Sequence, residues 1–276
     1  MRSIPRILCV ATLVATALTF AAPCRADLDE YVKKPDDAYA WKQVDVQETP
    51  LGKVAALELT SQVWQGITWK HSLRVYESAK TAQDAAVLLF ITGGSTGNKP
   101  GADMEMLAFT LAKLTGARVA LLSQVPNQPL LDGKKEDDLI AETFVNYLKT
   151  KDENWPLLFP MVKSAVKAMD AVQAWAKQER QVDVTKFVVT GASKRGWTTW
   201  LTSAVDDRVI ALAPMVIVML NLGAQGPNQL DVWGAYSVQI DDYVRRGLME
   251  EMKTGPGTKL WRMVDPYTYR DRLADK

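Results

Sequence analysis

The stretch around Ser193 combines the residue types that acyl-transfer chemistry requires. A buried strand at 187–190 runs into Gly191-Ala-Ser193 and then directly into a helix that begins near Gly196. In a nucleophile elbow, a strained turn between a strand and a helix presents a serine hydroxyl above the sheet, and the helix N-terminus adds positive potential. The spacing here, Gly-x-Ser-x-x-Gly, is one residue longer than the usual motif. It predicts Ser193 as a catalytic nucleophile, and the alternative is that Ser193 only caps the helix.

A glycine-rich loop earlier in the chain supplies the second part of such a site. Acyl transfer needs two backbone donors for the oxyanion, one from the residue after the nucleophile and one from a loop after an earlier strand. The N–H of Lys194 and the backbone of Gly93 and Gly94, which follow the apolar run 87–91, fit these two places. A phosphate-binding loop is the weaker interpretation, because neither the Gly-Lys-Ser/Thr ending nor the Gly-x-Gly-x-x-Gly spacing occurs there.

The base of a catalytic triad is the part that the sequence does not place. Hydrolases of this type run serine, acid, histidine along the chain, yet the one histidine, His71, lies far upstream in a strand segment. We expect His71 to be an ordinary exposed or hydrogen-bonded strand residue. Asp231 could serve as a displaced acid, although it suits better the N-cap of a helix over 232–238. Lys194 as the base would require strong desolvation. We therefore expect very slow ester turnover by this chain.

The elements that must position these residues alternate between buried strands and amphipathic helices. Strands are expected at 54–59, 63–76, 87–91, 118–123, 187–190 and 209–218, and helices at 104–114, 136–148, 158–178 and 196–205. The first two strands show the alternation of antiparallel pairs, whereas 87–91 is apolar at every position, as in a parallel strand covered on both faces. Residues 27–50 are polar and rich in turn residues. The pattern predicts one α/β domain over 27–276, with a mostly parallel sheet and helices on both faces.

Composition excludes several functions. Lys and Arg number 33 against 32 Asp and Glu, so no excess of basic residues indicates nucleic-acid binding. The cysteines, Cys9 and Cys24, both lie near the N-terminus, which leaves no thiolate zinc site or cysteine nucleophile in the remaining chain. We expect no cofactor and no metal, and an ester of a small molecule, peptide or carbohydrate as substrate.

Residues 1–26 predict an export signal. Arg2 and Arg6 precede the apolar run 7–22, and Cys24-Arg25-Ala26 places small residues where a signal peptidase cleaves. The alternative is a membrane anchor, but the run is shorter than the roughly 20 residues that span a bilayer. We expect a periplasmic or secreted protein without stable membrane insertion after cleavage.

The segments around the elbow resemble the PhoPQ-activated pathogenicity-related family of exported α/β-hydrolase-like proteins. The resemblance is carried by Gly191-Ala-Ser-Lys-Arg-Gly-Trp-Thr-Thr-Trp200, Ala213-Pro-Met-Val216, Leu89-Phe-Ile-Thr-Gly-Gly94, Trp155-Pro-Leu-Leu158 and Asp265-Pro-Tyr267. It implies an α/β-hydrolase sheet with Ser193 as nucleophile for an ester or amide, and an association with virulence. It also implies that the last strands, with the acid and the histidine, follow the segment at Asp265, so we expect the chain to be C-terminally incomplete. An inactive binding protein on the hydrolase scaffold is the alternative function.

Side chains near the elbow leave two questions open. A weaker similarity to glucuronoyl esterases, in which an arginine beside the serine helps to hold the oxyanion, does not decide whether Lys194 or Arg195 faces the site. Four tryptophans either line a cleft for a bulky or sugar-like ligand or, as we prefer, pack in the core. They are Trp197, Trp200, Trp233 and Trp261.

Overall fold

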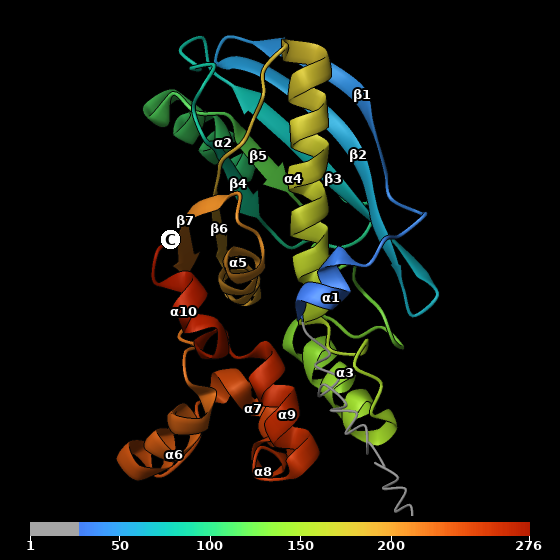
Figure 1. Cartoon of the computed structure of the whole chain (residues 1–276), viewed down its shortest axis with the longest axis vertical. Coiled ribbons are helices and arrows are strands. Elements are labelled where there is room, and N and C mark those ends of the chain that lie inside the picture. The colour runs from blue at the N-terminus through green and yellow to red at the C-terminus, as the bar shows by residue number, and fades with distance from the viewer. Residues whose placement is uncertain (1–27) are drawn as a thin grey trace, which may run out of the picture.

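A seven-stranded mixed sheet organises the computed structural model, which describes residues 28–276 (Figure 1). The strands are β1 (Ala40–Thr49), β2 (Gly52–Trp64), β3 (Ile67–Glu77), β4 (Val87–Ile91), β5 (Val119–Leu122), β6 (Phe187–Ala192) and β7 (Val209–Met215). Their order is β1-β2-β3-β5-β4-β6-β7. Neighbouring strands pair antiparallel along β1, β2, β3 and β5. They pair parallel along β5, β4, β6 and β7. The predicted α/β-hydrolase-like class is confirmed.

Helices cover both faces of the parallel strands. They are α1 (Leu28–Lys33), α2 (Ala102–Thr115), α3 (Glu136–Thr150), α4 (Leu158–Arg180), α5 (Lys194–Val205), α6 (Leu222–Trp233), α7 (Asp241–Val244), α8 (Leu248–Glu251), α9 (Gly255–Val264) and α10 (Arg270–Leu273). In β4, Leu89 and Ile91 join the large core under α4 and α5, while Phe90 packs with Phe109 of α2 on the other face. Two covered faces explain the uninterrupted apolar run, since each buried side chain of this size contributes roughly 1.5–3 kcal/mol.

The N-terminal strands differ from expectation in two places. The polar segment expected to be turns contains α1 and β1, and β1 was not expected because it is an edge strand with exposed or half-buried residues throughout. Such a strand shows little hydrophobic alternation. The strand expected over 63–76 is interrupted by a hairpin turn at Gln65 and Gly66, whose φ angles are 49° and 74°.

The C-terminal part also corrects one expectation. Asp231 does not cap a helix, because α6 begins upstream at Leu222 and places Asp231 near its C-terminal end, exposed to solvent. The helices α7, α8 and α9 lie against α3, below the sheet in Figure 1. β7 forms one edge of the sheet.

The described helices do not include a candidate membrane span. Within 28–276, none is both long enough and apolar enough to cross a bilayer. The export signal expected at 1–26 lies outside the described residues.

Candidate active site

The turn at Ser193 has the geometry of a nucleophile elbow. Ser193 joins β6 to α5 with φ 56° and ψ −125°, a strained conformation for a residue with a side chain. Its N–H donates to the carbonyl of Met215 at 2.9 Å, and its carbonyl accepts from the N–H of Trp197 at 3.0 Å. The Ser193 side chain makes no capping hydrogen bond to the helix. A helix cap is therefore not what this serine supplies in this structure.

Two glycines permit the elbow because the backbones pass close to one another there. A Cβ at Gly191 would lie 2.8 Å from the carbonyl oxygen of Arg195. A Cβ at Gly196 would lie 3.0 Å from the carbonyl oxygen of Met215 and 3.1 Å from that of Gly191. Any side chain at either position would push strand and helix apart, so both positions require glycine.

The predicted oxyanion loop follows the neighbouring strand. Ile91 of β4 is in register with Gly191 of β6, so the loops after both strands leave the same edge of the sheet. Gly93 packs so closely against the guanidinium of Arg195 that a Cβ there would overlap it. Gly93 and Gly94 line a hollow of about 360 Å³ that includes Arg195 but not Ser193.

Charged side chains from the starts of α3 and α5 meet beside the elbow. Glu136 binds the buried Arg195 through two hydrogen bonds, of 2.6 and 2.8 Å, and Arg195 Nε donates to the carbonyl of Val125 at 2.6 Å. Lys194 Nζ lies 2.6 Å from Asp137. Two cations in the first turn of α5 oppose its dipole, and the acids of α3 compensate them. Each of the two cations therefore lines a hollow next to the elbow. Lys194 lies beside Ser193 in one cavity, and Arg195, held by Glu136 and Val125, lines the hollow of Gly93 and Gly94.

Glu136 is ionised in this arrangement. Burial by itself would raise the pKa of Glu136. The hydrogen bonds and charge of Arg195, followed by Gln128 and Lys194, outweigh burial and lower this pKa to about 2. Glu136 also has φ 52°, and its N–H donates to Gln128 Oε1 at 3.0 Å. Sequence reasoning missed Glu136 and Asp137. The available signal was an acidic helix start together with the basic pair after the serine.

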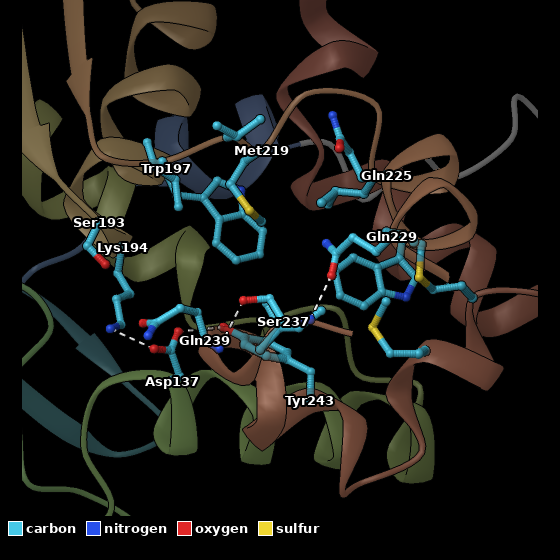
Figure 2. A pocket seen from close by; sticks show the side chains of 18 of the residues that line it. Asp137, Ser193, Lys194, Trp197, Met219, Gln225, Gln229, Ser237, Gln239 and Tyr243 are labelled. Carbon is cyan, nitrogen blue, oxygen red and sulfur yellow. Dashed lines mark hydrogen bonds and ion pairs between the residues drawn. The ribbon is translucent and has the colours of Figure 1, made fainter. Parts of the chain in front are cut away.

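A cavity of about 400 Å³ opens beside the nucleophile (Figure 2). Ser193 and Lys194 lie at one end, and Gln225 and Gln229 of α6 lie at the other. Asp137 accepts a hydrogen bond from the hydroxyl of Tyr243 at 3.0 Å, in addition to its ion pair with Lys194. The cavity therefore connects the elbow to the helices that follow β7.

The four tryptophans were expected either to line a cleft or to pack in the core, and they differ from one another in the structure. Trp197 and Trp261 are buried in the core and also line the cavity, so both interpretations apply to them. Trp200 is partly buried and does not line the cavity. Trp233 is 78% exposed and belongs to neither the core nor the cavity.

The histidine lies outside this cavity. His71 is buried in β3, with Ser61 Oγ at 2.9 Å from Nε2 and the carbonyl oxygen of Ser123 at 3.3 Å from Nδ1. Burial lowers the pKa of His71 to about 4, against the opposing effect of its hydrogen bonding to the backbone of Ser123 and Gln124. The expectation of a hydrogen-bonded strand residue is confirmed. Asp231 does not line the cavity either. In the described part of the chain, no group of three or more histidines, cysteines and acids could hold a metal ion.

A sequence model of the PhoPQ-activated pathogenicity-related protein family matches residues 28–275. The chain belongs to this family. Autocrine proliferation repressor protein A of Dictyostelium discoideum is 35% identical over 281 residues, covering 98% of this chain and 56% of the relative. The PhoPQ-related chain thus spans little more than half the length of this curated relative.

Solved structures with the same fold include two esterases. An acetyl xylan esterase from a Thermoanaerobacterium species has a TM-score of 0.56 at 14% identity, covering 92% of this chain and 76% of that one. Another, from a Paenibacillus species, has a TM-score of 0.55 at 11% identity, covering 90% and 72%. At such identities the likeness shows the α/β-hydrolase fold alone.

Proposed function

We propose that this PhoPQ-related chain hydrolyses acyl esters or amides through Ser193. The observation that carries the proposal is the strained turn that places Ser193 between β6 and α5 at one end of a cavity. Ser193 Oγ attacks the carbonyl carbon of an ester and forms an acyl-serine, the alcohol leaves with the proton, and water then hydrolyses the acyl-serine. Lys194 N–H, in the first turn of α5, is the proposed first oxyanion donor. The proposed second donor is the backbone of Gly93 or Gly94, although these glycines line the neighbouring hollow and not the cavity of Ser193.

Turnover is proposed to be slow, because no histidine is among the described residues that line the cavity, so none is placed to take the serine proton. His71 is buried in β3 and bonded to Ser61, outside the cavity. Lys194 is paired with Asp137, which also accepts from Tyr243. Hydrolases without a complete triad retain roughly 10³- to 10⁴-fold acceleration from binding and oxyanion donors.

A second candidate is an exported, virulence-associated binding protein on the hydrolase scaffold. The observation that favours it is the burial of His71 in β3, bonded to Ser61 and outside the cavity of Ser193. For either function we propose a periplasmic or secreted location, on the basis of the sequence at 1–26. The ester substrate of the first function is a small molecule, peptide or carbohydrate.

Labelling with a fluorophosphonate probe tests the first function, since the probe phosphonylates a serine hydroxyl that an elbow and oxyanion donors make reactive, even when turnover is slow. We expect the folded chain to be labelled at Ser193 and the Ser193→Ala variant to remain unlabelled. Ser203→Ala is the matched control, because Ser203 lies on the same helix and donates to the carbonyl of Thr199 inside the protein. Its labelling should equal that of the parent. An unlabelled parent chain would reject the hydrolase and favour the binding protein.

A further inference from the structure

The cavity beside Ser193 is larger than an acetyl group requires. Its volume of about 400 Å³ lies in the range of roughly 300–1,000 Å³ typical of sites for drug-sized ligands. Apolar side chains form most of its wall: Trp197, Met219, Leu222, Ile240, Met249, Met252 and Trp261. Three of these are methionines, whose flexible thioethers adapt to apolar groups of different shape. The wall therefore suits an extended apolar group.

The charges in the wall cancel. Among the described residues that line the cavity, the charged side chains are Lys194 and Asp137, which bind each other at 2.6 Å next to the serine. At the far end, Gln225 and Gln229 offer neutral amides. A carboxylate or ammonium carried into this end would lose its hydration without gaining a partner of opposite charge, which is costly. The bound group should accordingly be uncharged.

One glycine leaves the space open at that end. Gly226 lies between Gln225 and Gln229 in α6, is buried, and lines the cavity. A Cβ at Gly226 would lie 3.3 Å from Met249 Cε, the flexible end of a side chain, so the backbone there does not require glycine. Glycine inside a helix is less favourable than alanine. Its effect here is to keep the wall without a side chain.

We infer that the cavity receives an uncharged, largely apolar acyl group longer than acetyl, and that Gly226 determines how long a group is accepted. This substrate class rests on the proposed hydrolase function, since Ser193 would attack the carbonyl at the near end. The alcohol part of the ester leaves through the open side and is not selected by this wall.

Binding to the Ser193→Ala variant tests the inference without requiring hydrolysis. The probes are acetamide, hexanamide and the monoamide of adipic acid, which carries a carboxylate at the far end, titrated by ligand-observed NMR. We expect hexanamide to bind at least ten-fold more tightly than acetamide, because each buried methylene contributes up to about 0.8 kcal/mol. The adipic monoamide should bind at least ten-fold more weakly than hexanamide. Equal affinities in either comparison would overturn the inference.

Substitutions at two glycines of α6 complete the test. In the Ser193→Ala background, Gly226→Leu should lower the affinity for hexanamide at least ten-fold, and Gly226→Ala should lower it less while keeping the thermal midpoint of the parent. Gly223→Leu is the matched control, since Gly223 is exposed, has open space around it, and does not line the cavity. Unchanged affinity in Gly226→Leu would remove the role of Gly226.

The two proposals can fail separately. If the parent resists fluorophosphonate but Ser193→Ala still prefers hexanamide, the hydrolase fails and the selective cavity stands. If the parent is labelled but Ser193→Ala shows no preference for the longer amide, the hydrolase stands and the selective cavity fails.

Discussion

The two walls of the cavity are built differently. On the elbow side, Ser193 is strained, Arg195 is buried in a two-bond ion pair, and Gly191 has no room for a methyl group. On the opposite side, α6 exposes Trp233 to 78% and has open space around Gly223. The difference indicates that the position of the nucleophile is set by close packing, whereas the wall that selects the bound group lies in a lightly packed segment.

The opposite wall is nevertheless attached to the elbow side through α3. Tyr243 of α7 donates to Asp137, and Arg246 forms an ion pair with Asp138. Glu136, one residue earlier, holds Arg195. The first turn of α3 thus contacts both walls, so a change in this turn should affect both.

The largest expected difference is in stability, between a glycine-to-alanine substitution at the elbow and one in α6. Gly191→Ala should destabilise the protein by about 2–3 kcal/mol, because its Cβ would overlap the carbonyl of Arg195 and force strand and helix apart. Gly223→Ala should leave stability unchanged or raise it by up to about 1 kcal/mol, since alanine is the better helix former. Urea unfolding of the two variants measures both effects. Equal stabilities would show that the walls do not differ in packing.

An intermediate effect is expected from the ion pair behind the elbow. Glu136→Gln should destabilise the fold by about 1–3 kcal/mol, less than for a fully buried pair because the Glu136 side chain is 39% exposed. Asp241→Asn, at the start of α7, should cost less than about 0.5 kcal/mol, since Asp241 and Arg245 are both more than half exposed. Thermal unfolding of both variants at neutral pH makes the comparison.

The contribution of the Glu136–Arg195 ion pair to stability should depend on pH. The pKa of Glu136 is lowered in the folded state to about 2, below its ordinary value of 4.5, so its contribution to stability is present above pH 4.5. That contribution should decline as the pH falls from 4.5 towards 2. Glu136→Gln should lack this part of the pH dependence, and an unaltered profile in the variant would assign the acid sensitivity to other groups.

The smallest effect is expected from a large apolar residue at the end of α6, outside the cavity. Trp233→Gln should change the free energy of unfolding by less than about 0.5 kcal/mol, because the indole is mostly in water already. It should also leave binding of hexanamide unaltered, since Trp233 does not line the cavity. A loss above about 1 kcal/mol in chemical unfolding would mean that this segment is packed more firmly than its exposure indicates.

The sequence predictions were correct where neighbouring residues decide the structure, and wrong where residues far along the chain decide it. β4 was predicted residue for residue, because a strand covered on both faces is apolar at every position. Asp231 was misplaced because α6 begins upstream, where the N–H groups of Asn221 and Leu222 donate to the carboxylate of Asp265 at 3.1 and 2.7 Å. A helix start stabilised by a residue more than 40 positions away leaves no local signal.

The sequence by itself determined the elbow at Ser193, since a buried strand, a Gly-x-Ser turn and a helix are consecutive and their conformations follow from local preferences and burial. Tertiary structure alone decided that Arg195 is held by Glu136, 59 residues away, while Lys194 faces the cavity with Asp137. It also decided that Gly93 and Ser193 line different hollows and that α6 forms the far wall. The reason is physical: ion pairs and cavities depend on side chains that the fold brings together from distant elements, and neither periodicity nor spacing records which ones meet.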